Sequence, residues 1–196
     1  LDSSYTDKER TTFHSIYSPP LKVLIQHTNL TSQNFYAETI LKELAVHNKS
    51  FGSTENGVKA VKNFLGGKGI DLKGFYMTDG SGLSRFDGMT AKQLGEILLV
   101  FAKDSLHFDD FYSTLAVAGK TGTLKSIGKN TILEGNLRAK SGTMSRIKSY
   151  AGYVKNKSEK ELIFVMISNN HLISGRQMKA RFEKLMLLIA NLESEN

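Results

Sequence analysis

The chain of 196 residues contains no cysteine, two prolines and no apolar run of about 18 residues, the length that a membrane-spanning helix needs. Without cysteine it can form no disulfide, cysteine nucleophile or thiolate metal site. It begins Leu1-Asp2-Ser3, with neither a methionine nor an apolar signal-type stretch. We therefore expect it to be part of a longer protein. Its hydrophobic share of 40% is typical of a globular chain.

Acidic residues are in the minority, because 19 Asp and Glu stand against 26 Lys and Arg and the formal net charge is +7. The lysines are scattered from Lys8 to Lys184, and neither an RNA-binding aromatic pattern nor a Cys/His finger accompanies them. We therefore expect no nucleic-acid partner. The five histidines lack metal-ligand spacing, and Gly66-Gly67-Lys68-Gly69 lacks the ending of a phosphate loop. The sequence thus predicts no metal and no cofactor.

Apolar periodicity predicts helices that alternate with loops, followed by strands and a last helix. The helices are expected from residue 21 to a break at 29–32, then over about 35–47, 58–65, 91–102, 111–115 and 177–192. The strands are expected to begin at 137 and to cover 148–155 and 161–168, with a short candidate at 75–77. A polar turn at 156–160 joins the last two strands as a hairpin. This pattern favours an α+β fold, an antiparallel sheet flanked by helices.

Three short segments carry residue types that are typical of catalytic sites. Ser32-Gln33-Asn34 lies in a break directly before a helix, Asp79–Arg85 is a glycine-rich turn, and Arg138–Met144 lies on a strand before a hairpin. Taken singly, each has an ordinary explanation as a helix cap, a turn or a common triplet. The Lys-Ser/Thr-Gly triplet indeed occurs twice, beginning at Lys120 and at Lys140.

The order of these segments carries a resemblance. Ser-x-Asn before a helix, followed by Lys-Ser/Thr-Gly on a strand, is typical of the penicillin-recognising serine enzymes. With Tyr-Ala-Glu after Asn34 and the Asp-Gly-Ser-Gly-Leu-Ser-Arg turn, the chain resembles the D-alanyl-D-alanine carboxypeptidase/endopeptidase family known as penicillin-binding protein 4, peptidase family S13. The match runs from about Ser18 to Met166. It selects Lys140 over Lys120, and Lys140 also leads into the hairpin whereas Lys120 lies in a predicted loop.

The resemblance implies that residues 1–196 are the C-terminal part of a penicillin-binding, transpeptidase-like domain with the fold shared by β-lactamases. It also implies the role of each residue in acyl transfer to a serine. Ser32 would relay a proton, Asn34 would hold a substrate carbonyl, and Lys140 would supply positive charge. The ligand-binding residues implied are Ser141, Gly142, Thr143, Arg85, Met144 and Ser145. The hydroxyls of Ser141 and Thr143 would bind the terminal carboxylate, and Arg85 would face the stem-peptide side chain beside Met144 and Ser145.

The family's first motif, Ser-x-x-Lys, has two matches, Ser126–Lys129 and Ser145–Lys148. Neither suits a nucleophile, because the first lies in a glycine-rich loop and the second in strand-like sequence, where residues three apart point to opposite faces. We therefore expect the nucleophile segment to lie outside this chain and the chain alone to be inactive. An apolar face of the sheet would then be open, and a homodimer or domain swap that covers it is one hypothesis.

The expected activity is that of a periplasmic serine-type D-Ala-D-Ala carboxypeptidase, with peptidoglycan stem peptides and β-lactams as ligands. Two alternatives remain open. One is a β-lactamase or esterase on the same scaffold. The other is a non-catalytic peptidoglycan-binding module that keeps the groove but lacks the nucleophile.

Overall fold

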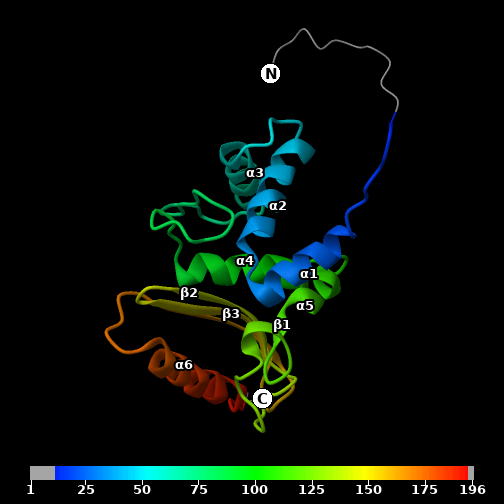
Figure 1. Cartoon of the computed structure of the whole chain (residues 1–196). Coiled ribbons are helices and arrows are strands. Elements are labelled where there is room, and N and C mark those ends of the chain that lie inside the picture. The colour runs from blue at the N-terminus through cyan, green and yellow to red at the C-terminus, as the bar shows by residue number, and fades with distance from the viewer. Residues whose placement is uncertain (1–11, 194–196) are drawn as a thin grey trace.

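The computed structural model describes residues 12–193. Helices come first in this part of the chain, and the sheet and a last helix follow (Figure 1). The elements are α1 (Leu21–Thr31), α2 (Asn34–His47), α3 (Thr54–Gly67), α4 (Ala91–Lys103), α5 (Phe108–Thr114), β1 (Ala116–Val117), the 3-10 turn η1 (Gly122–Leu124), β2 (Arg138–Met144), β3 (Ile147–Lys155), β4 (Glu161–Ser168) and α6 (Gly175–Ala190).

The strands form one antiparallel sheet in the order β1-β2-β3-β4. β1 is two residues long and pairs only with Arg138 and Ala139 at the start of β2. From Lys140 to Met144, β2 is therefore paired on its β3 side alone. The predicted hairpin of β3 and β4 is confirmed, and the Asn156 side chain accepts hydrogen bonds from two backbone N–H groups inside its turn. The fold thus leaves an open strand edge at the third motif.

The sheet lies between α4 on one face and α6 on the other (Figure 1). Alternate residues of β3 supply the two cores, because successive side chains of a strand point to opposite faces. Tyr150 packs edge-on against Phe182 of α6, with ring centroids 5.9 Å apart. Tyr153 lies on the other face, packs in the core with Leu98 of α4, and donates its hydroxyl to the Leu98 carbonyl. Each such buried side chain contributes about 1.5 to 3 kcal/mol.

The expectation of an open apolar sheet face is wrong for the described residues. α4 and α5 cover one face and α6 covers the other, so Tyr150–Val154 of β3 are buried throughout. No residue of the four strands is among the large, exposed hydrophobic side chains of residues 12–193. The reason for expecting a homodimer is therefore absent.

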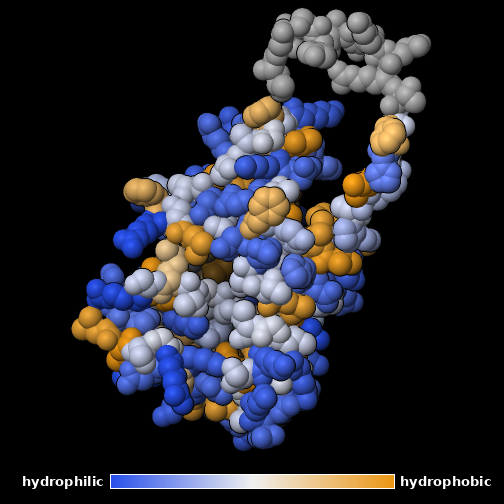
Figure 2. Space-filling view, in the orientation of Figure 1, coloured by the Kyte–Doolittle hydropathy of each residue, from blue (hydrophilic) through white to orange (hydrophobic). Residues whose placement is uncertain are grey.

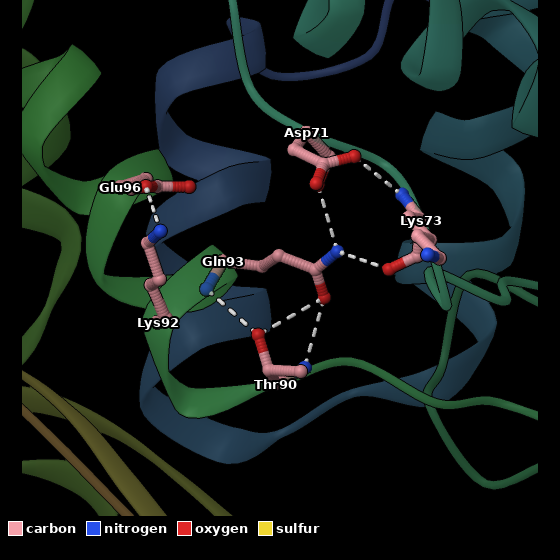
Figure 3. A network of polar contacts seen from close by, with 6 residues as sticks. All are labelled: Asp71, Lys73, Thr90, Lys92, Gln93 and Glu96. Carbon is pink, nitrogen blue, oxygen red and sulfur yellow. Dashed lines mark hydrogen bonds and ion pairs between the residues drawn. The ribbon is translucent and has the colours of Figure 1, made fainter.

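A buried glutamine anchors the start of α4 (Figure 3). Thr90 and Gln93 form a reciprocal capping box, in which the side chain of each accepts a hydrogen bond from the backbone N–H of the other. The Gln93 amide also donates to the backbone carbonyls of Asp71 and Lys73, at 2.8 and 3.1 Å. This network ties the segment after α3 to the helix that covers the sheet.

The sequence predicts the order of the helices correctly, with one difference at the site. α1 does not break at Asn29 but continues to Thr31. The hydroxyls of Thr28 and Thr31 bond back to carbonyls one turn earlier, at Leu24 and His27, and satisfy their polar groups within the helix. The break is confined to Ser32 and Gln33. No helix in the described range has the length and apolar character needed to cross a membrane.

Candidate active site

A groove of about 420 Å³ runs along the open edge of β2, where the surface is hollowed between the helices and the sheet (Figure 2). All three sequence segments contribute to it. Its lining consists of Ser32, Asn34, Ser81, Gly82, Leu83, Thr123, Lys140, Ser141, Gly142, Thr143, Met144, Ile147 and Ser149. A larger cavity of about 630 Å³, which includes Arg138 and Lys155, contains none of the predicted site residues. The smaller groove is therefore the candidate site.

Ser32 lies at the end of α1 in a left-handed backbone conformation, with φ of 55°. Its N–H bonds to the carbonyl of Thr28, which closes the helix. A residue with a Cβ atom pays about 1 to 2 kcal/mol for this conformation. The left-handed conformation of Ser32 turns the chain sharply between α1 and α2. Ser32 and Asn34 both lie on the groove.

Lys140 joins the second motif to the third. Its Nζ donates to Ser32 Oγ at 2.6 Å and to the Ser141 carbonyl at 2.9 Å. Burial lowers the pKa of Lys140, because the ammonium form loses hydration. No acidic side chain among residues 12–193 pairs with it. The Ser32 hydroxyl is therefore held by the Lys140 ammonium, which releases a proton more readily than an ordinary lysine does.

Asn34 occupies the first turn of α2 and is exposed on the groove. Its side-chain amide has no hydrogen-bond partner among the described residues. The amide can therefore donate to, or accept from, a ligand that enters the groove.

The side chains of Ser141 and Thr143 each have a hydrogen-bond partner from another segment. Ser141 Oγ donates to Thr123 Oγ1 at 2.8 Å, and Thr143 Oγ1 accepts from Lys148 Nζ at 2.6 Å. Neither Thr123 nor Lys148 was predicted for the site. Thr123 directly follows the triplet Lys120-Thr121-Gly122, which the family resemblance does not select as the catalytic one. Lys148 stands opposite Thr143 in the hairpin register, and pairing the two strands about their turn would have found it.

The glycine-rich turn is held against α2. Glu38 of α2 accepts hydrogen bonds from the N–H groups of Gly80 and Ser81, at 2.9 and 3.0 Å. A Cβ atom at Gly80 would lie 2.7 Å from the Ala37 carbonyl oxygen, so the close approach requires glycine. The side chain of Asp79 closes the turn by accepting from the N–H groups of Gly82 and Ser84. These contacts fix Ser81, Gly82 and Leu83 on the groove.

Two predicted residues lie outside the groove lining. Arg85 is exposed beyond Leu83 and has no hydrogen bond or ion pair with the described residues. Ser145 is exposed in the turn between β2 and β3. Met144, which precedes it, does line the groove.

Neither Ser-x-x-Lys match forms a serine–lysine pair at the groove. Ser126 accepts a hydrogen bond from Lys179 of α6 rather than from Lys129. Lys148 bonds to Thr143 rather than to Ser145. Neither serine lines the groove. Nor do three His, Asp or Glu side chains gather as a metal site within the part of the chain that the structure describes.

Sequence comparison matches residues 3–192 to the D-Ala-D-Ala carboxypeptidase 3 (S13) family. The chain is 34% identical over 145 residues to the D-alanyl-D-alanine carboxypeptidase of Actinomadura sp. strain R39, covering 71% of this chain and 27% of that protein. It is 33% identical over 171 residues to carboxypeptidase DacB of Mycolicibacterium smegmatis, covering 85% of this chain and 37% of that one.

Among solved structures, penicillin binding protein 4 (dacB) of Haemophilus influenzae has the same fold, with a TM-score of 0.79 and 28% identity over 88% of this chain and 40% of that one. A second structure of that protein, complexed with a β-lactam, has a TM-score of 0.77 and covers 85% of this chain. The chain thus spans about a quarter to two fifths of the length of these relatives.

Proposed function

This chain belongs to the D-Ala-D-Ala carboxypeptidase 3 (S13) family, and we propose that it supplies part of the active site of a serine peptidase. The substrate would be the D-alanyl-D-alanine end of a peptidoglycan stem peptide, and β-lactams would acylate the same serine. The observation that carries this proposal is the 2.6 Å contact between Lys140 Nζ and Ser32 Oγ, on a groove along an open strand edge.

The reaction proposed is acyl transfer in two steps. A serine hydroxyl attacks the carbonyl carbon of the penultimate D-alanine, an ester bond forms, and the amide C–N bond breaks. The proton lost by the nucleophile reaches the leaving amine through Ser32 Oγ. Lys140 donates a hydrogen bond to that oxygen, which directs the Ser32 proton away from Lys140 and towards the groove. Water then hydrolyses the ester and regenerates the serine.

The other groove residues would orient the substrate. The Asn34 amide would hold a carbonyl on the acyl side. The terminal carboxylate would meet Lys140 and the hydroxyls of Ser141 and Thr143. The N–H of Thr143 would supply one half of the oxyanion hole and the N–H of the nucleophile the other. Gly142 leaves the edge of β2 without a side chain where substrate backbone would approach.

The nucleophile itself would come from a part of the protein outside these residues. Support comes from the two Ser-x-x-Lys matches, whose serines lie off the groove, and from the fraction of each relative that the chain spans. The chain would then be the C-terminal part of the penicillin-binding domain and would not be acylated alone. Because the substrate is peptidoglycan, the proposed location is the periplasm. Arg85, with Met144 and Ser145, would face the stem-peptide side chain.

A matched pair of lysine variants tests the function. We expect the full-length protein to release D-alanine from a peptide that ends in D-Ala-D-Ala, and Lys140→Met to abolish the release. Lys120→Met changes the equivalent lysine of the other triplet, which pairs with Glu134 outside the groove, and should retain activity. Turnover of β-lactams without release of D-alanine would instead indicate a β-lactamase. Binding without either reaction would indicate a peptidoglycan-binding module.

A further inference from the structure

Lys148 is a second lysine that contacts a groove residue, and the proposed reaction assigns it no role. It projects from β3, opposite Thr143 of β2, and its Nζ donates to Thr143 Oγ1 at 2.6 Å. The ring of Tyr150 lies beneath the ammonium, with its centroid 5.4 Å from Nζ. These two contacts hold the charge directly behind the edge strand.

The direction of this hydrogen bond determines what Thr143 can do. An ammonium group has only donors, so Thr143 Oγ1 must act as the acceptor. The hydroxyl proton of Thr143 is then free to point away from Lys148, towards the groove that Thr143 lines. The contact with a cation also polarises the hydroxyl, which strengthens a hydrogen bond that it donates to an anion.

The charge of Lys148 is not compensated within the described residues. No carboxylate lies within ion-pair distance of its Nζ. Glu183 of α6, which acts on the adjacent Tyr150, accepts a hydrogen bond from the N–H of Gly128. Burial and the neighbouring Lys179 on α6 both disfavour the charged form and lower the pKa of Lys148. The Tyr150 ring and Thr143 Oγ1 offset part of this charge without neutralising it. An incoming anion would neutralise it.

We propose that Lys148 is a positioning residue for carboxylate recognition. It fixes the Thr143 hydroxyl as a donor and places positive charge behind the end of the groove that takes the ligand's carboxylate. The protein would therefore distinguish a free carboxylate from a neutral ester or amide at that position through Lys148 as well as Lys140. This inference rests on the proposed function, because the carboxylate is that of the stem peptide or of a β-lactam.

The test compares acylation of the full-length protein by benzylpenicillin and by its methyl ester, in which the carboxylate is neutral. In Lys148→Met we expect the second-order acylation constant for the acid to fall about ten-fold, the scale of one hydrogen bond to a charged group. The constant for the ester should stay within about two-fold. Lys148→Arg, which keeps the charge, should retain most of the preference for the acid. Lys157→Met removes the same charge from an exposed site at the β3–β4 turn and should change neither constant.

Three results overturn the inference, and they differ from one another. An equal fall for acid and ester, accompanied by a lower melting temperature, would mean that Lys148 only stabilises the hairpin. Unchanged constants for both ligands would mean that it does not act on the groove. A wild-type protein that neither ligand acylates would overturn the proposed function, and this inference with it.

Discussion

Replacing Ser32 by alanine and, separately, by glycine distinguishes the strain at this residue from the function of its hydroxyl. Both variants lose the acceptor of the Lys140 hydrogen bond. Only glycine removes the Cβ atom that makes φ of 55° unfavourable. The two variants should therefore behave alike in acylation and differently in stability.

The magnitudes follow from these two contacts. Loss of the hydrogen bond should cost about 1 kcal/mol in both variants. Glycine removes the left-handed penalty, which stabilises the folded state by about 1 to 2 kcal/mol. It also gives the unfolded chain more freedom, which lowers the stability by about 0.5 to 1 kcal/mol. We expect Ser32→Ala to unfold about 1 kcal/mol more easily than wild type. The midpoints of the two ranges for glycine make the unfolding free energy of Ser32→Gly about 0.75 kcal/mol higher than that of Ser32→Ala. Acylation by a β-lactam should fall about 10² to 10⁴-fold in both.

Urea denaturation measures the first quantity and the rate of covalent labelling of the full-length protein the second. If Ser32→Gly were as unstable as Ser32→Ala, the strain at this position would not be what the backbone geometry indicates. If either variant were acylated at the wild-type rate, Ser32 would not relay a proton.

Three further changes test the fold around the site. Gly152→Ala should lower the free energy of unfolding by at least about 3 kcal/mol, because its Cβ would lie 2.0 Å from the Arg138 carbonyl oxygen in the next strand. The control Gly175→Ala meets no atom within 4 Å and should be nearly neutral, and thermal melts compare the two variants. Gln93→Leu should cost about 1 to 3 kcal/mol in urea denaturation, since the carbonyls of Asp71 and Lys73 lose their donor. Burial and Glu183 raise the pKa of Tyr150 to about 12 in the folded state. The stability that this raised pKa provides is present below the unfolded pKa of about 10 and is lost as the pH rises towards 12. Tyr150→Phe should therefore lose less stability than wild type in melts across that range; an equal loss would contradict the assignment.

Most of the architecture was predictable, because a helix or strand that buries one face has apolar residues at a regular spacing in the sequence. The alternation around Tyr150 and Gly152 and the apolar run in β4 predicted the hairpin, which the structure confirms. The polar residues before α2 and at the start of β2 predicted the two motifs that meet on the groove. The contact between Ser32 and Lys140 followed from the family resemblance rather than from any local signal.

The remaining site residues depend on tertiary contacts that local patterns do not encode. Thr123 reaches Ser141 only because the loop after β1 folds back against β2. The left-handed residue Ser32 closes a helix that continues to Thr31, beyond Asn29, where the local sequence predicts a break. The expected open sheet face was wrong because α4 and α5 cover it, and the amphipathic pattern of a helix does not say which surface it will cover.

Covalent labelling with a fluorescent penicillin would show whether Ser32 and Lys140 assist a nucleophile that is supplied from outside these residues. We expect the full-length protein to be labelled, Lys140→Met to be labelled far more slowly, and the 196-residue chain alone not to be labelled. Labelling of the isolated chain would contradict this expectation, because the nucleophile would then be one of the serines in this sequence. A full-length protein that resists labelling would contradict the proposed acyl-enzyme chemistry itself.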